Sequence, residues 1–310
     1  MVRVYSILGS TASGKSAAAR QLAGRLGGQI VSVDSMKVYR RMDIGTAKPT
    51  PAQRAEIPHH CIDIVEPGEP FSVARYVEHA DRAISHIAAA GGVVLAAGGT
   101  GLYLKALAEG LFEGPAADAD VRRRLTERAA KEGLAALHAE LAAIDPEAAA
   151  RIHPNDEKRI VRALEVHELT GEPISRLQEQ WDRQRTRYDC VFIGLRRRRE
   201  DVNRRVNARV KRMIAQGLRD EVAALLAEPA GLSPQAAQAL GYAEMIEHLS
   251  GRCSLEDAVE QIKINTRRFA RKQQTWFRRF RDTHWIDVAE DASAEAVADQ
   301  AAKYIRPVAG

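Results

Sequence analysis

The stretch Gly9-Ser-Thr-Ala-Ser-Gly-Lys-Ser16 follows the apolar run from Val4 to Leu8 and precedes an alanine-rich helical pattern. It matches the phosphate-binding loop pattern Gly-x-x-x-x-Gly-Lys-Ser/Thr. Glycines let the backbone curl so that several N–H groups and a helix N-terminus point at one anion, and the lysine adds a positive charge. The stretch predicts a di- or triphosphate site with Ser16 as a magnesium contact. The alternative is an ordinary turn between a strand and a helix.

Length and composition limit the class of protein. The chain has 310 residues, 45% of them hydrophobic, which predicts either one large domain with an insertion or two domains. The net charge of +5 is modest, but the basic residues are clustered, as a polyanionic partner requires. The cysteines, Cys61, Cys190 and Cys253, lie too far apart to indicate a zinc site or a disulfide framework. With no signal pattern and no apolar run of transmembrane length, we expect a cytoplasmic enzyme with no membrane contact.

Two further apolar runs end in polar residues. The predicted strand 29–33 leads into Asp34 and Ser35, and the predicted strand 93–97 leads into two glycines and Thr100. Ligands of open α/β sheets bind at the carboxyl ends of the strands. Asp34 is therefore a candidate general base or metal ligand, with a helix cap as the alternative. The glycines and Thr100 indicate a close approach to a ligand, with a plain turn as the alternative.

The end of strand 93–97 also lacks an acidic residue. A phosphate-loop NTPase usually places a magnesium-binding Asp at the end of such a strand. Here the strand ends Ala-Ala-Gly-Gly, which weakens the interpretation as an ATPase or kinase.

The segment from Met36 to Pro70 is rich in loop signals, and loops of this length in an α/β domain are commonly functional. His59 and His60 lie within it, and we expect structural hydrogen bonding for both because no third metal ligand is near in sequence. A helix over 72–90 presents apolar residues at helical spacing and belongs to the core.

The character of the sequence changes after Gly114-Pro115. From Asp118 to about Arg187 the pattern predicts consecutive helices, and strand-like sequence resumes at Tyr188. We therefore predict an α/β fold: a P-loop NTPase-like parallel sheet core in 1–117 and 188–310, with an inserted all-helical domain in 118–187. Basic helices follow in the C-terminal part of the core.

Two basic stretches lie in that second part of the core. Arg205 and Arg209 are four residues apart and share a helix face, which suits a diphosphate, although a solvated surface face is the alternative. Residues 263–281 carry many cations and no acidic residue, interleaved with aromatic residues. This combination is typical of single-stranded RNA binding, and the alternative is an amphipathic helix whose aromatic residues face the core.

Several motifs together resemble the bacterial tRNA dimethylallyltransferases, also called tRNA isopentenyltransferases. They occur in the order typical of that family and span nearly the whole chain. The stretches Met42–Pro49 and Arg271–Arg278 are the most distinctive. The motifs are Gly9–Ser16, Asp34–Tyr39, Met42–Pro49, Gly98–Tyr103, His153–Asp156, Gly241-Tyr242 and Arg271–Arg278.

The resemblance implies transfer of a dimethylallyl group from dimethylallyl diphosphate to the exocyclic amine of the adenosine on the 3′ side of the tRNA anticodon. The phosphate loop then holds a leaving diphosphate, with Mg²⁺ as the cofactor. This explains why strand 93–97 does not end in a magnesium-binding aspartate. The inserted domain would grip the anticodon stem-loop, and the target base would be flipped into a channel. We expect a monomer.

The resemblance also implies roles for individual residues. Those assigned to catalysis are Asp34 as the general base, Thr100, Lys15 and Arg209. The diphosphate would be bound by Gly9, Ser10, Thr11, Ala12, Ser13, Gly14, Lys15, Ser16, Arg205 and Arg209, with Ser16 contacting the metal. tRNA would be contacted by Asp34, Ser35, Met36, Lys37, Thr100, Arg122, Lys158, Arg159, Ile160, Val161, Arg162, Gly241, Tyr242, Arg271, Lys272, Gln273, Gln274, Thr275, Trp276, Phe277 and Arg278.

Two other functions stay open at the level of sequence. One is an adenylate isopentenyltransferase or a small-molecule P-loop kinase, which would need neither the helical insertion nor the basic aromatic stretch. The other is a non-catalytic RNA-binding protein. The presence of Lys15, Ser16 and Asp34 argues against that alternative.

Overall fold

The computed structural model of the chain describes residues 1–111, 114–182 and 186–305. It divides into two compact units: Met1–Ala108 together with Arg187–Gly310, and Glu109–Thr186. The expected insertion, 118–187, corresponds to the second unit, which begins earlier than expected. Within the described ranges, no helix is long and apolar enough to cross a membrane.

The first unit is built on a six-stranded sheet in which every strand pairing is parallel. The strand order is β3-β2-β4-β1-β5-β6. The central strand is paired on both sides, with Val4 opposite Val94 on one neighbour and opposite Cys190 on the other. The strands are β1 (Arg3–Gly9), β2 (Gln29–Val33), β3 (His59–His60), β4 (Val94–Gly98), β5 (Asp189–Arg196) and β6 (His284–Asp287). The predicted α/β parallel sheet is confirmed.

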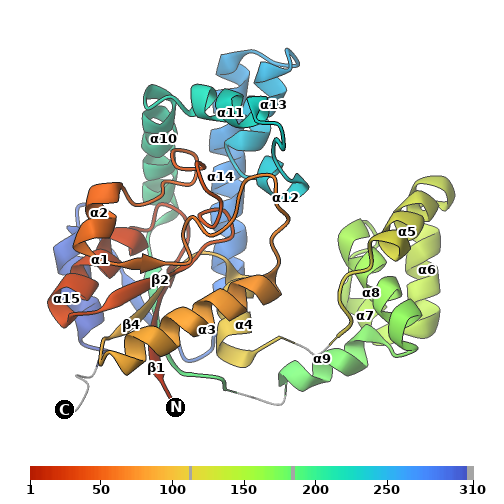
Figure 1. The fold of residues 1–310 in the computed structure, drawn as a ribbon, viewed down its shortest axis with the longest axis horizontal. Helices are drawn as coiled ribbons and strands as arrows, with labels where there is room; N and C mark the ends of the chain where they lie inside the picture. The colour runs from red at the N-terminus through yellow and green to blue at the C-terminus, as the bar shows by residue number, and fades with distance from the viewer. Residues whose placement is uncertain (112–113, 183–185, 306–310) are drawn as a thin grey trace. The chain divides into compact units, whose positions relative to one another are not determined.

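Ten helices of this unit are described, and they cover both faces of the sheet (Figure 1). The longest, α14, packs against α10, α13 and β1. The helices are α1 (Lys15–Leu26), α2 (Pro51–Glu56), α3 (Val73–Ala89), α4 (Gly101–Glu109), α10 (Arg199–Ala215), α11 (Leu218–Ala227), α12 (Pro234–Ala237), α13 (Tyr242–Leu249), α14 (Leu255–Phe277) and α15 (Ala294–Ala302).

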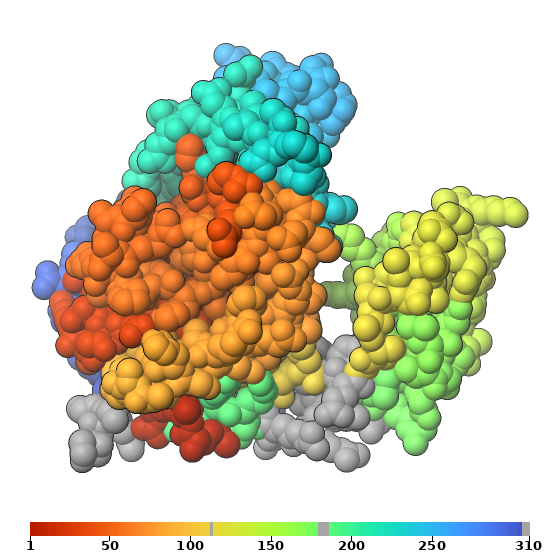
Figure 2. Space-filling view, viewed as in Figure 1, coloured from red at the N-terminus to blue at the C-terminus, as the bar shows by residue number. Residues whose placement is uncertain are grey.

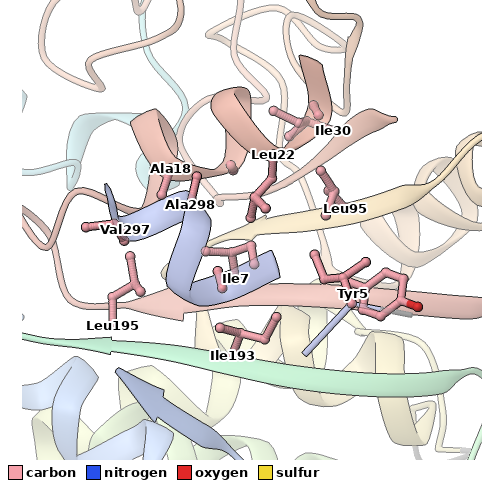
Figure 3. Close-up of a cluster of buried hydrophobic side chains, with 14 of the residues drawn as sticks. Tyr5, Ile7, Ala18, Leu22, Ile30, Leu95, Ile193, Leu195, Val297 and Ala298 are labelled. Carbon is pink, nitrogen blue, oxygen red and sulfur yellow. The ribbon is translucent and has the colours of Figure 1, made fainter. Parts of the chain in front are cut away.

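One face of the sheet is buried against α1 and α15 (Figure 3). Ile7, Leu95 and Ile193 project from three neighbouring strands and are inaccessible to solvent, and Leu22 of α1 packs onto them. Each such side chain contributes about 1.5–3 kcal/mol on burial. The alanines of α1 and α15 are small enough to let the two helices contact each other over the sheet. This packing fixes the start of α1, and with it the end of the phosphate-binding loop.

The second unit consists of helices around its own core. Its helices are α5 (Ala119–Glu132), α6 (Leu134–Ile144), α7 (Pro146–Arg151), α8 (Glu157–Thr170) and α9 (Ile174–Asp182). The sequence places an aspartate before three of them, and each carboxylate accepts a hydrogen bond from the first turn, as an N-cap does. These caps are Asp118, Asp145 and Asp156. The consecutive helices predicted for this stretch are therefore confirmed.

The segment between β2 and α3 contains structure that the sequence analysis did not predict. Two residues, His59 and His60, form the edge strand β3 beside β2, and α2 precedes them. The Nδ1 atom of His59 lies 2.6 Å from the Ile57 carbonyl oxygen, and Nε2 of His60 lies 2.7 Å from Oε1 of Gln29. The prediction that these histidines serve structural hydrogen bonding is confirmed.

Candidate active site

The loop from Gly9 to Ser16 connects β1 to α1 and has the backbone of an anion cradle. Ala12 and Gly14 adopt left-handed conformations, with φ of 63° and 100°, which turn successive N–H groups the same way. Gly14 is the N-cap residue of α1 and has no side chain to cap the helix, so the first N–H groups of α1 stay available to an anion. A Cβ on Gly9 would lie 2.9 Å from the Leu195 carbonyl oxygen, so a larger residue does not fit there.

Three arginines from the segment after β5 surround this loop. The Nε atom of Arg197 donates to the Ser13 carbonyl at 3.0 Å, and Nε of Arg205 donates to the Ala12 carbonyl at 2.8 Å. A terminal nitrogen of Arg209 lies 3.4 Å from Oγ1 of Thr11. Burial lowers the pKa of Arg197 and Arg209 from the usual arginine value. The structure therefore places Arg205 and Arg209 at the loop; Arg209 is half-buried, whereas Arg205 stays exposed.

Lys15 is the lysine of the loop pattern, and its Nζ donates to the Ser10 carbonyl at 3.2 Å. Burial lowers the pKa of Lys15 to about 7, and the neighbouring cations Lys37 and Arg209 contribute to the shift. Asp34 opposes it through its negative charge. An anion bound in the loop would raise this pKa, because it would offset both the burial and the repulsion.

The ends of β2 and β4 bring Asp34 and Thr100 together. The Oδ1 atom of Asp34 accepts hydrogen bonds from the backbone N–H groups of Met36 at 2.9 Å and Lys37 at 3.3 Å. These bonds orient the carboxylate, and no described residue donates a hydrogen bond to its Oδ2. Oγ1 of Thr100 accepts a hydrogen bond from the N–H of Ser35 at 3.1 Å. Asp34 therefore has the geometry of a cap and also an oxygen free to take a proton.

Gln273 of α14 joins the two parts of the site. Its Oε1 accepts a hydrogen bond from the Thr11 N–H at 2.7 Å, and its Nε2 donates to the Gly99 carbonyl at 2.9 Å. The side chain is 6% exposed. Gln273 was predicted to contact tRNA, but the structure uses both ends of its amide to connect the phosphate-binding loop to the end of β4.

The structure also buries other side chains that were predicted to contact tRNA. Ile160 and Val161 belong to the core of the second unit, and Phe277 is 1% exposed. Tyr242 is fully buried, and its hydroxyl donates to Oε1 of Glu221 at 2.6 Å. These side chains are unavailable to RNA in this structure, because helical periodicity turns them inward.

Two predicted tRNA contacts of the second unit are engaged in an internal ion-pair cluster. Arg122 forms a bidentate pair with the fully buried carboxylate of Glu165, at 2.9 and 3.0 Å. Arg162 binds the same carboxylate at 2.6 Å. The Asp118 N–H donates to Glu165 as well, and the arginines together with this N–H hold the pKa of Glu165 below its usual value. The cluster therefore joins α5 to α8 within the helical unit.

Gly241 is the N-cap residue of α13, and its N–H donates to Oε2 of Glu244 at 2.7 Å. The remaining candidates are accessible to differing degrees. Ser35, Met36, Lys37, Gln274 and Trp276 are half-buried, whereas Lys158, Arg159, Arg271, Lys272, Thr275 and Arg278 are exposed.

Trp276 lies against α4, where a Cβ on Gly101 would meet its ring at 2.4 Å. The guanidinium of Arg279 lies 4.9 Å from the centre of the ring. Phe280 is buried against Phe192, with ring centres 4.7 Å apart. The alternative of a core-facing aromatic set is therefore correct for Phe277 and Phe280, while the cations beside them stay exposed.

Lys48 organises the segment before α2, and the sequence analysis gave it no role of its own. Its side chain is 1% exposed, and its Nζ binds Asp43 at 2.5 Å, Asp63 at 2.6 Å and the Tyr39 carbonyl at 2.8 Å. Three successive N–H groups of residues 43–45 donate to Glu221 of α11. Figure 2 shows this orange segment against the teal helices on the surface of the first unit.

The chain resembles proteins of known identity over most of its length. Residues 37–280 match the family described as IPP transferase. The tRNA dimethylallyltransferase of Geobacter metallireducens is 50% identical over 92% of each chain, and that of Geobacter sulfurreducens is 49% identical over the same shares.

Solved structures of tRNA prenyltransferases are also similar to this chain. The tRNA isopentenylpyrophosphate transferase of Bacillus halodurans aligns with a TM-score of 0.72 and 39% identity, covering 97% of this chain and 95% of that one. A eukaryotic dimethylallyltransferase, described as acting on tRNA, aligns with a TM-score of 0.79 and 27% identity, covering 97% of this chain and 78% of that one. The phosphate-binding loop, the free acid oxygen beside it and these similarities lead to one conclusion: the chain belongs to the IPP transferase family of tRNA prenyltransferases.

Proposed function

We propose that this protein transfers the dimethylallyl group of dimethylallyl diphosphate to N6 of the adenosine on the 3′ side of the tRNA anticodon. The observation that carries this proposal is the placement of Asp34 beside the phosphate-binding loop, with Oδ1 fixed by two N–H groups and Oδ2 free. A base next to a diphosphate cradle suits alkyl transfer to an amine.

In the reaction, the amine nitrogen forms a bond to the allylic carbon as the bond from that carbon to the diphosphate oxygen breaks. The diphosphate leaves with the electron pair, and the amine proton passes to Oδ2 of Asp34. Negative charge develops on the leaving group, where Lys15 and Arg209, together with the N–H groups of the loop, are placed to stabilise it. Thr100, fixed by its bond to the Ser35 N–H, would help position the acceptor base.

We further propose Mg²⁺ as the cofactor, bound by Ser16 and the phosphate oxygens of the donor. The side chain of Ser16 is exposed at the start of α1, and the described residues contain no cluster of acidic or histidine ligands that would form a separate protein cage. This donor set fits Mg²⁺, which keeps several waters and is commonly held by substrate phosphates. When bound, Mg²⁺ would neutralise charge on the diphosphate.

We propose that one copy of the chain is sufficient and acts in the cytoplasm on tRNA. All the side chains placed at the phosphate-binding loop come from the first unit of a single chain. These contacts support a site built from one copy. Gel filtration with light scattering of the purified protein, with and without tRNA, measures its mass in solution, which should be that of one copy of the chain.

The acceptor is tested by offering two substrates. Protein, Mg²⁺ and dimethylallyl diphosphate are incubated with either unmodified tRNA or free AMP, and nucleosides from the products are identified by mass spectrometry. We expect N6-dimethylallyladenosine from tRNA alone, with fragment mapping placing it next to the anticodon. Modification of AMP at a comparable rate would instead support the adenylate isopentenyltransferase alternative.

Lys15 makes donor binding dependent on pH. Its pKa of about 7 means that it is protonated below pH 7 and increasingly neutral above it. Because the bound diphosphate favours the charged form, binding at pH 8 should take up a proton, and affinity should fall as pH rises from 7 towards the ordinary lysine pKa of about 10.4. Calorimetry of diphosphate binding in buffers of different ionisation enthalpy measures the uptake.

The matched control for this prediction is Lys15→Arg, which keeps a positive charge at every pH of the experiment. It should bind without taking up a proton between pH 7 and 9. Equal proton uptake in the two proteins would contradict the role given to Lys15.

A further inference from the structure

A cavity of about 260 Å³ lies between α10 and α14 of the first unit, apart from the residues assigned to the donor site. Its lining comes from two helices that pack against each other. On α14 the lining residues recur at positions three and four apart, so they share one face. The lining consists of Arg199, Asn203, Ile264, Arg267, Arg268 and Arg271.

The cavity gathers positive charge that the protein leaves largely unneutralised. Among its four arginines, Arg267 pairs with Glu260 at 3.4 Å and bonds to Asn207. In the ranges that the structure describes, Arg199, Arg268 and Arg271 form no ion pair with a carboxylate. Many other exposed arginines of this unit do form one, such as Arg3, Arg41 and Arg196. Bringing like charges together is unfavourable unless an anion binds between them.

The lining identifies the class of anion. The planar guanidinium group matches phosphate oxygens with paired hydrogen bonds, and Asn203 adds a neutral donor. The lining contains no aromatic ring on which a base could stack. These features suit a phosphate group and not a nucleobase.

We propose that this cavity binds a phosphodiester of the tRNA backbone, an inference that rests on the proposed function. The cations of α14 continue from the cavity through Arg271 and Lys272 to Arg278, all exposed. At 1.5 Å per residue, Arg268 and Arg278 lie roughly 15 Å apart along the chain direction of the helix. The cavity would therefore extend the RNA contact by about one helical turn before the stretch Arg271–Arg278, and would add Arg199 of α10 to it. A continuous cationic surface of this length suits a polymer better than a free phosphate.

The test is the salt dependence of tRNA binding by the variant Arg199→Gln/Arg268→Gln, measured without donor. One lost phosphate contact should reduce the slope of log K against log salt by about 0.7–0.9, and affinity at low salt should fall roughly tenfold. Arg268→Lys should keep the slope, since it keeps the charge. Lys211→Gln, an exposed cation of α10 outside the cavity, is the control for charge loss and should leave affinity and slope close to those of the wild type.

A second measurement distinguishes a phosphate of the tRNA backbone from a free polyphosphate as the group that binds in the cavity. Binding of inorganic pyrophosphate and of ATP is measured in parallel, without tRNA, on the wild type and the double variant. A second pyrophosphate site that is lost in the variant while tRNA binding is unchanged would overturn the proposal in favour of a free polyphosphate. A double variant whose tRNA binding matches that of Lys211→Gln would overturn it as well.

Folding and catalysis are checked separately. Both substituted arginines are exposed, so the unfolding midpoint should match that of the wild type, and a matching midpoint makes any loss of binding a property of the site. The transfer assay on the wild type reports on the proposed function, whereas the salt slope reports on the cavity alone.

Discussion

Replacing Asp34 by Asn should lower the rate of transfer at saturating tRNA and donor by about 10²–10⁴-fold, the range for loss of a general base. Asparagine keeps an oxygen that can accept the N–H bonds of Met36 and Lys37, so the turn after β2 should survive. It cannot take the proton of the amine. The measurement is single-turnover transfer of labelled dimethylallyl, with tRNA affinity determined alongside by filter binding.

The control for this variant is Asp291→Asn, an exposed aspartate that precedes α15. It should transfer at the wild-type rate. A variant Asp34→Asn that transfers normally at saturation, with only weaker tRNA binding, would show that Asp34 serves as a tRNA contact and not as the base.

Replacing Lys48 by Met should destabilise the first unit by about 3 kcal/mol, the lower end of the range for breaking a buried ion pair. The side chain of Lys48 is buried, while Asp43 and Asp63 keep some contact with solvent, at 57% and 26% exposure. Asp63 also retains its pair with Arg54, which limits the loss. Urea unfolding followed by circular dichroism measures the change as a lower midpoint.

The same change should also weaken donor binding, because the segment held by Lys48 reaches the donor site. The Thr46 carbonyl lies 3.4 Å from a terminal nitrogen of Arg209, which in turn lies beside the phosphate-binding loop. Lys211→Met, at an exposed position, is the control and should leave the midpoint unchanged. An unchanged midpoint in Lys48→Met would show that the ion pairs contribute nothing net to stability.

The parts of the site that lie close together in sequence were predictable. The phosphate-binding loop follows from spacing alone, and Asp34 and Thr100 follow from the rule that ligands bind where parallel strands end. The face shared by Arg205 and Arg209 follows from helical periodicity. Each of these inferences depends on local geometry, which a short stretch of sequence determines.

The contacts between distant segments were not predictable in this way. Gln273 lies 262 residues from Thr11, and Arg197 lies 184 residues from Ser13, yet both side chains hold the loop. No periodicity encodes such a pairing, because it depends on how α10 and α14 pack on the sheet. Gly45 and Tyr242 form another such long-range contact, because a Cβ on Gly45 would lie 2.3 Å from the ring of Tyr242. The motifs Met42–Pro49 and Gly241-Tyr242 therefore pack against each other.

Some structure was missed although a local pattern was present. α2 begins with a capping box, in which Thr50 accepts from the Gln53 N–H and the Gln53 side chain accepts from the Thr50 N–H. Thr, Pro and Gln at these positions are a recognisable helix start. β3, by contrast, has only two residues, too few for an alternating pattern to appear.

The central claim is that the phosphate-binding loop holds a prenyl diphosphate and that tRNA is the acceptor. It is tested most directly by measuring diphosphate release from purified protein and Mg²⁺ with dimethylallyl diphosphate or ATP, each with and without unmodified tRNA. The account predicts release only when dimethylallyl diphosphate and tRNA are both present, in equal amount to the modified adenosine. Turnover of ATP without tRNA, and no release from the allylic donor with tRNA, would contradict it.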